Sequence, residues 1–122
     1  MNNLNSILIE GNLVRDAELR TTPKGTAVCT FPIASNRYYK QDTGFEKEVS
    51  FFNVEAWAKL AESAGISGRK GSPVRIVGRL RQDRWQDRED KPQSKVVIVA
   101  EHIEFRPEFK NAPNADTETE EA

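Results

Sequence analysis

Short stretches in which apolar and polar residues alternate recur along the chain, separated by turn-forming residues. Alternation with a period of two places every second side chain on one face of an extended strand, so each stretch predicts a strand with one buried face. Residues that bend the chain easily lie at 23–25, 42–44 and 87–92, and each group predicts a hairpin. The five predicted strands cover residues 6–14, 27–35, 49–57, 74–85 and 95–105.

Good helix formers occupy residues 57–64, between the third and the fourth predicted strand. Glycines follow at positions 65 and 68, where a helix can end in a left-handed cap. The order β-β-β-α-β is that of the OB fold, a five-stranded Greek-key barrel that commonly binds single strands or sugars. The sequence therefore predicts an all-β OB-fold barrel with one short helix between strands 3 and 4, in a domain of residues 1–106. A plain β-meander is the alternative.

Two glycines occupy matching places inside predicted strands. Gly11 lies in the run Ile-Glu-Gly-Asn-Leu, and Gly78 lies in the similar run Ile-Val-Gly-Arg-Leu. Glycine weakens a strand, so its usual reason there is a bulge or a sharp bend. We expect both glycines to mark places where a strand bends around the barrel.

The composition excludes several classes of protein. A chain of 122 residues with 37% hydrophobic and 30% charged residues is typical of one soluble globular domain, and no apolar run approaches the roughly 20 residues of a membrane span. Its single cysteine, Cys29, cannot form an internal disulfide and is expected to be a small buried hydrophobe, which fits a cytoplasmic protein. One cysteine and one histidine are too few for a zinc site, so no metal is expected.

The charge is distributed unevenly along the chain. Residues 1–107 contain 17 Lys and Arg against 14 Asp and Glu, a net charge of +3, whereas residues 108–122 contain one Lys against five acidic residues, a net charge of −4. A mildly basic body fits a protein that binds polyanions, although it fits many others as well. The segment 107–122 has one large apolar residue and is predicted to be a disordered acidic tail.

Known catalytic patterns are not found in the sequence. The segment 65–72 contains glycines, a lysine and a serine, but it leads into a strand rather than into the helix that a phosphate-binding loop requires. The acidic residues near 87–90 belong to a predicted hairpin tip with mixed charge, which is typical of solvated surface. His102 has no nucleophile at a recognisable spacing. We therefore expect a protein that is not an enzyme and has no cofactor.

Aromatic and polar residues share one face of the third predicted strand. The alternation places Phe51 and Trp57 on the same side. Asn53 and Glu55 lie between them on that side. Rings beside polar groups indicate an exposed face, which would make both rings available for stacking. The alternative is that either ring covers an end of the barrel.

Two further groups combine rings with cations. Trp85 lies on a long hairpin strand, and the alternation puts Arg79 and Arg81 on its face. Tyr38 and Tyr39 lie just past residue 35, at the end of the second predicted strand, between Arg37 and Lys40. The cations next to these rings in the sequence are Arg37, Lys40, Arg79, Arg81 and Arg84.

Rings and cations together suit a single-stranded nucleic acid. Each base that stacks on a ring contributes about 1 to 3 kcal/mol, and lysines and arginines displace counterions from the phosphates. Neither interaction reads a base sequence. The pattern predicts sequence-tolerant binding of single-stranded DNA that weakens strongly with salt, and it does not separate DNA from RNA.

Several short motifs follow one another in order between residue 5 and about residue 106. They are Asn-Ser-Ile-Leu-Ile-Glu-Gly-Asn-Leu at 5–13 with Asp-Ala-Glu-Leu-Arg at 16–20, Lys-Leu-Ala-Glu at 59–62, Arg-Lys-Gly-Ser at 69–72, and Gly-Arg-Leu-Arg at 78–81 with Arg-Trp at 84–85. With these motifs at this spacing, the chain resembles the bacterial single-stranded DNA-binding proteins of replication.

The resemblance implies an OB fold that assembles as a homotetramer, binds single-stranded DNA in replication, repair and recombination, and acts at the nucleoid. It implies that the stacking rings are Tyr39, Phe51, Trp57 and Trp85, with Tyr38 as an adjacent candidate. Phosphate contacts are implied by the family pattern for four cations and suggested by neighbourhood for four others. The first four are Arg20, Lys59, Lys70 and Arg81, and the others are Arg37, Lys40, Arg79 and Arg84.

Two features depart from that family pattern. Members usually end in an acidic tip closed by hydrophobic residues that docks on replication and repair proteins, whereas this sequence ends in Thr-Glu-Thr-Glu-Glu-Ala. Asn53 and Glu55 lie between two presumed stacking rings, where a neutral or basic residue would suit phosphate better, so a lower affinity is expected. A primosomal replication protein of the same fold and an OB adaptor that binds a protein or a sugar are the alternative functions.

Overall fold

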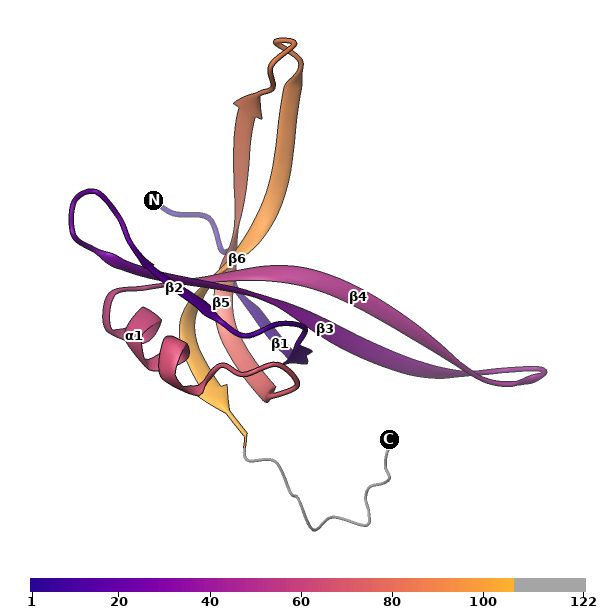
Figure 1. Ribbon diagram of the computed structural model, residues 1–122. Helices are drawn as coiled ribbons and strands as arrows, with labels where there is room; N and C mark the ends of the chain where they lie inside the picture. The colour runs from indigo at the N-terminus through magenta and orange to yellow at the C-terminus, as the bar shows by residue number, and fades with distance from the viewer. Residues whose placement is uncertain (107–122) are drawn as a thin grey trace.

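The computed structural model describes residues 1–106 of the 122-residue chain, so the predicted acidic tail at 107–122 lies outside the described residues. Six strands and one helix follow one another along residues 1–106 (Figure 1). They are β1 (Ile7–Leu13), β2 (Glu18–Thr21), β3 (Ala27–Gln41), β4 (Gly44–Trp57), α1 (Ala58–Ser67), β5 (Pro73–Gln86) and β6 (Pro92–Phe105).

Five of the strands form a closed barrel. The order in the sheet is β1-β5-β6-β4-β3-β2, and an additional pairing between β1 and β3 joins the two ends of the five-stranded part. β4 and β6 pair in parallel, and the other neighbours are antiparallel. This architecture confirms the predicted OB-fold barrel with its helix between the third and the fourth barrel strand.

The short strand β2 was not predicted from the sequence. It lies outside the closed barrel and pairs only with β3, from Glu18 opposite Thr30 to Thr21 opposite Ala27. All four of its residues are exposed. A strand with no buried face has no apolar alternation, so the prediction of five strands was one strand short.

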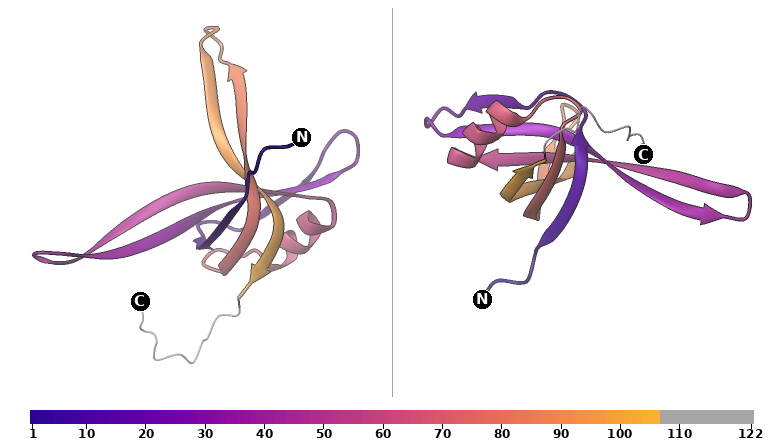
Figure 2. Two further views of the ribbon diagram at one scale, coloured as in Figure 1. Left: turned by 180° about the vertical axis from the view of Figure 1, so that it is seen from behind. Right: turned by 90° about the horizontal axis from the view of Figure 1, so that it is seen from below.

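Two hairpins extend beyond the barrel as long arms. Figures 1 and 2 show the β3–β4 arm and the β5–β6 arm pointing away from the barrel in different directions. The β3–β4 ladder continues without interruption to the pair Gln41 and Gly44, so the predicted ends at residues 35 and 49 were wrong. The arm is exposed on nearly all positions beyond the barrel, and the backbone ladder rather than a buried face maintains it there.

The core fills the barrel and is closed at one end by α1. Buried side chains from the strands include Phe31, Ile33 and Ile76, and the helix adds Ala61 and Ala64. The helix is confirmed, and within residues 1–106 no helix is long and apolar enough to cross a membrane.

The predicted left-handed cap at the end of α1 is wrong. The helix continues through Gly65 and ends at Gly68, whose φ of −83° and ψ of 92° are extended. The Gly68 N–H donates to the Ala64 carbonyl. A side chain at Gly68 would lie 2.7 Å from the Ala17 Cβ atom, so this glycine allows close contact between segments rather than an unusual φ.

Gly78 lies at a bulge in β5, as the sequence predicted. The register between β5 and β6 shifts between Val77 and Gly78, and a Cβ atom at Gly78 would collide with the Val99 carbonyl oxygen. Gly11 allows a similar close approach, because a Cβ atom there would lie 2.6 Å from the Ala34 carbonyl oxygen. Both glycines therefore lie where two backbones of the barrel approach closely.

Replacing Gly78 by alanine should lower the free energy of unfolding by about 1 to 3 kcal/mol, because backbone must move to make room for the new methyl group. Urea unfolding followed by tryptophan fluorescence measures the loss. Gly65→Ala is the control, since the nearest neighbour of its Cβ atom would be the Leu19 side chain at 3.2 Å rather than a backbone atom. Equal stability of the two variants would contradict this interpretation of Gly78.

Candidate nucleic-acid interface

Phe51 and Trp57 lie on the outward side of β4. The inward side carries the buried residues Val54 and Ala56, and the strand alternates regularly between the two sides. Phe51 is 67% exposed and Trp57 is 39% exposed. The structure thus places both rings on the face that the sequence predicted, with the polar Glu55 between them.

The two neighbouring tyrosines of β3 lie on opposite sides of the β3–β4 arm. Ala34 is the register partner of Phe51, and Tyr38 follows Ala34 by an even number of residues, so Tyr38 shares the side of Phe51. Tyr39 lies on the other side, where the Arg37 guanidinium is 5.0 Å from the centre of its ring. The structure therefore groups Tyr38, and not Tyr39, with the rings of β4.

Trp85 on the β5–β6 arm lies on the same side of the sheet as these rings. Glu55 is the register partner of Val99 on β6, and Val99 is the partner of Arg79 on β5. Arg81 and Trp85 follow Arg79 at even spacing, so they share its side. We call this side of the sheet, from Tyr38, Phe51 and Trp57 to Trp85, the ring surface.

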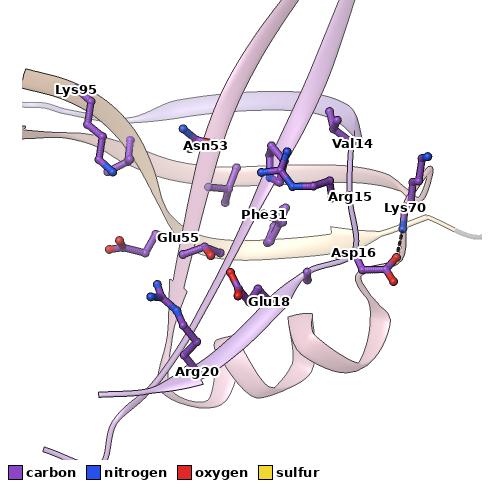
Figure 3. A pocket seen from close by; sticks show the side chains of 15 residues that line it. Val14, Arg15, Asp16, Glu18, Arg20, Phe31, Asn53, Glu55, Lys70 and Lys95 are labelled. Atoms are coloured by element: carbon purple, nitrogen blue, oxygen red, sulfur yellow. Dashed lines mark hydrogen bonds between the residues drawn. The ribbon is translucent and has the colours of Figure 1, made fainter. Parts of the chain in front are cut away.

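A groove of about 850 Å³ adjoins the ring surface, because Asn53 and Glu55 from the outward side of β4 line it, although none of the four rings does (Figure 3). Four cations line it, and two of them, Arg20 and Lys70, were predicted from the sequence. The other two, Arg15 and Lys95, were not predicted. Arg15 lies in the connection between β1 and β2, where no periodic pattern identifies it, whereas Lys95 could have been found from its place opposite Asp83 in the β5–β6 hairpin.

The turn that follows α1 borders one end of the groove in Figure 3. There the Lys70 backbone N–H donates to the Asp16 carboxylate at 2.7 Å, the bond that Figure 3 marks with a dashed line. This bond involves the Lys70 backbone and not its ammonium group. Lys95 and Arg20 lie toward the other end of the groove in the same view. Positive side chains are therefore present at both ends.

Three other predicted cations also lie on the side of the rings. Lys40 follows Tyr38 at even spacing near the tip of the β3–β4 arm. Arg79 lies 3.8 Å from the Glu101 carboxylate, and both side chains are about half exposed. Arg81, the third, makes much closer contacts with carboxylates.

The remaining three predicted cations are not on the ring surface. Arg37 lies on the side of Tyr39 and pairs with Glu48 at 3.6 Å. Arg84 lies opposite to Trp85 on β5 and donates to the Gln82 side chain at 3.0 Å. Lys59 lies in the first turn of α1 and is exposed. The strand alternation that places Trp85 outward necessarily places Arg84 on the other side.

Arg81 is held by two carboxylates. Its Nη1 atom donates to Glu55 Oε1 at 2.6 Å, and its Nη2 atom donates to Glu55 Oε2 at 3.1 Å. The Nε atom donates to Asp83 Oδ1 at 2.8 Å, and Nη2 also donates to Asp83 Oδ2 at 3.1 Å. These bonds raise the pKa of the Arg81 guanidinium and lower the pKa of the Asp83 carboxyl group. The charge of Arg81 is thus neutralised within the protein.

Glu55 also holds Trp57. The indole Nε1–H donates to Glu55 Oε1 at 2.8 Å. Partial burial would raise the pKa of the Glu55 carboxyl group, but the hydrogen bonds from Arg81 and Trp57 outweigh burial and lower the pKa below its ordinary value. Glu55 therefore stays ionised at neutral pH and links the end of β4 to β5.

A lysine lies over the ring of Trp85. The Lys95 ammonium group lies 5.9 Å from the centre of the Trp85 ring, within the range of a cation–π contact. Trp85 is 47% exposed and also borders a smaller hollow of about 490 Å³ at the tip of the β5–β6 arm. A flat ring beside a cation can receive a base and its phosphate together.

Cys29 lies on the inward side of β3, opposite Ala56, and is therefore separated from the outward rings by the sheet. Cys29 is buried in the core, where burial, followed by the nearby charge of Glu18, raises the pKa of its thiol. This placement confirms the prediction of a buried hydrophobe. Among residues 1–106, no group of three or more His, Cys, Asp or Glu side chains is arranged to hold a metal ion.

Comparisons with known proteins show which family the chain resembles. A family model described as "Single-strand binding protein family" matches residues 4–106. The chain is 41% identical over 102 residues to the single-stranded DNA-binding protein of Helicobacter hepaticus, covering 83% of this chain and 60% of that protein. It is 40% identical over 119 residues to that of Aquifex aeolicus, covering 97% and 80%, and 38% identical over 105 residues to that of Treponema pallidum, covering 86% and 59%. The chain thus spans about three fifths of the length of the Helicobacter and Treponema proteins.

Proposed function

The chain belongs to the single-strand binding protein family, and from this premise we propose that it binds single-stranded DNA on the ring surface. Bases stack on Tyr38, Phe51, Trp57 and Trp85, and cations along the groove neutralise phosphates. The chain does no chemistry on the strand: it coats the strand and keeps it unpaired during replication, repair and recombination.

One observation carries this proposal: the register of the sheet brings exposed rings from three strands to the same side. A stacked base contributes about 1 to 3 kcal/mol and needs an exposed flat ring. Basic residues beside the rings add binding free energy that does not depend on the base sequence, because they release counterions from the phosphates. The groove lined by Arg15, Arg20, Lys70 and Lys95 supplies such residues next to Asn53 and Glu55 on the side of the rings.

The direct test is a comparison of single and double strands of the same sequence. Fluorescence anisotropy of a labelled oligonucleotide of dT should report tight binding that weakens as salt rises. The corresponding duplex should bind far more weakly, since its bases are stacked on one another and cannot reach the rings. Equal binding of single strand and duplex would contradict the proposal.

The two tyrosines of β3 provide a matched pair of variants. Tyr38→Ala should weaken binding of dT oligonucleotides by about 1 to 3 kcal/mol, because Tyr38 shares the side of Phe51. Tyr39→Ala removes the same ring one residue further on, and its effect should be clearly smaller, since Tyr39 lies on the other side with Arg37. Anisotropy titrations of both variants measure the difference. A larger loss for Tyr39→Ala would assign the stacking role to Tyr39 instead.

We further propose that the chain acts as a homotetramer. Phe52, Leu80 and Val96 lie on the opposite side from the ring surface and are 38%, 42% and 56% exposed, which is apolar area that a second copy can cover. Multiangle light scattering of the protein, free and with oligonucleotides of graded length, measures the assembly. A monomer at micromolar concentration would contradict this part of the proposal.

The proposed role also implies where in the cell the protein works. Single-stranded DNA forms where a chromosome is copied and repaired, so the protein would act in the bacterial cytoplasm at the nucleoid. The organisms of the three relatives, all bacteria, support this setting.

A further inference from the structure

Arg81 lies between Trp57 and Trp85 on the ring surface, but most of its hydrogen-bonding capacity is already used. Of the five N–H donors of a guanidinium, four make bonds to Glu55 and Asp83 at 2.6 to 3.1 Å. The side chains of Arg81 and Glu55 are only 33% and 16% exposed. The pair with Glu55 is bidentate, the geometry in which an arginine binds a carboxylate most strongly.

The cations around Arg81 differ from it in this respect. Within residues 1–106, Arg15, Arg20, Lys70 and Lys95 form no ion pair shorter than 4 Å, although all four line the groove. The cluster of Arg81 with its two carboxylates carries a net charge of −1. Lys95 lies opposite Asp83 in the β5–β6 ladder, so the middle of the ring surface carries no net positive charge, whereas the groove lining has four cations against the three carboxylates Asp16, Glu18 and Glu55.

Resting on the proposed function, we propose that Glu55 and Asp83 mask Arg81 from the phosphates of bound DNA, and that Glu55 at the same time fixes the Trp57 ring for stacking. A phosphate could reach Arg81 only by displacing two carboxylates while their negative charge repels it. The ring surface between Trp57 and Trp85 thus contributes stacking, and the phosphates are neutralised by the cations at the groove ends.

Removal of the two negative charges should expose Arg81. Glu55→Gln removes the charge of Glu55 and keeps an oxygen acceptor for the Trp57 indole. Asp83→Asn removes the charge of Asp83 and keeps an oxygen acceptor for Arg81. One additional phosphate contact makes the slope of log K against log salt steeper by about 0.7 for a single strand. At 0.1 M salt the double variant should therefore bind about fivefold more tightly than the natural protein. The affinity of each single variant should lie between those of the natural protein and the double variant.

The chain offers a matched control for the change in charge. Arg75 is also held by two carboxylates, Glu10 at 2.6 Å and Glu104 at 3.7 Å, but it lies where β5 meets β1, away from the groove. The double variant Glu10→Gln with Glu104→Gln changes the net charge by the same amount. Its salt slope should stay that of the natural protein.

A third variant assigns the gain to one side chain. When Arg81→Gln is added to the Glu55→Gln and Asp83→Asn variant, the steeper slope should return to that of the natural protein. Glu55→Ala, which also removes the acceptor for the indole, should bind less tightly than Glu55→Gln. Circular dichroism and urea unfolding verify that each variant is folded.

The outcomes separate this proposal from the proposed function. If the natural protein binds dT oligonucleotides but the variants without the two negative charges keep its slope and affinity, the masking of Arg81 is wrong and the function stands. The masking is also wrong if the control at Arg75 gains as much, or if the gain survives Arg81→Gln. If the natural protein does not bind the oligonucleotides at all, the proposed function itself fails.

Discussion

Replacing Trp57 and Trp85 together by alanine should weaken binding of single-stranded DNA by about 2 to 6 kcal/mol, the sum of about 1 to 3 kcal/mol for each stacked base. Even the lower value is a loss of about thirtyfold in Kd. Both rings are partly exposed on the ring surface, and they come from different strands, so one variant tests whether the end of β4 and the β5–β6 arm act on the same ligand. Anisotropy of a labelled dT oligonucleotide measures the loss without relying on tryptophan fluorescence.

The control for this variant retains flat rings at both positions. Trp57→Phe with Trp85→Phe should keep most of the affinity, because a phenyl ring still stacks on a base, although it cannot donate to Glu55 as the Trp57 indole does. The unfolding curves of the two double variants should be similar. Binding by the alanine variant at the strength of the natural protein would remove both tryptophans from the interface.

The second large effect concerns the barrel itself. Phe31→Ala should lower the free energy of unfolding by about 3 to 5 kcal/mol, because the Phe31 ring is 2% exposed and its loss leaves a cavity in the core. Its ring centre lies 6.4 Å from that of Phe105, so β6 loses a contact as well. Domains of this size are stable by only about 5 to 15 kcal/mol, so the variant should lose a large part of its stability and unfold at a much lower urea concentration.

Phe45 provides the comparison for Phe31. It lies near the tip of the β3–β4 arm and is 79% exposed, so Phe45→Ala removes the same ring without a cavity. Urea unfolding should show little change for Phe45→Ala, within about 0.5 kcal/mol. Similar losses for the two variants would mean that the core is not centred on Phe31 as the structure has it.

The side of each residue on its strand could be predicted from the sequence, because a period of two is a local property. The alternation placed Phe51 and Trp57 outward correctly, and it placed Trp85 with Arg79 and Arg81. The hairpin turns were equally local, as the left-handed Gly25 and Gly44 illustrate. Features that depend only on neighbouring residues in the chain could therefore be predicted from the sequence.

Contacts between residues far apart in the chain could not be predicted in this way. The pairing of Arg81 with Glu55 joins two residues that are 26 positions apart, and nothing near either residue in the sequence indicates it. Arg81 was therefore assigned to phosphate with the other cations. Two adjacent tyrosines posed a different difficulty, since a choice between Tyr38 and Tyr39 requires the register of the β3–β4 ladder.

The most direct test of the central claim uses the two tryptophans of the chain as they are. Trp57 and Trp85 should both be quenched when poly(dT) is added at low salt, and a rise in salt should restore their fluorescence. Base stacking on both rings predicts a quenching that saturates with the amount of DNA. Saturated binding of poly(dT) with unchanged tryptophan emission would mean that unpaired bases contact some other surface of the barrel, and the stacking role of the ring surface would be wrong.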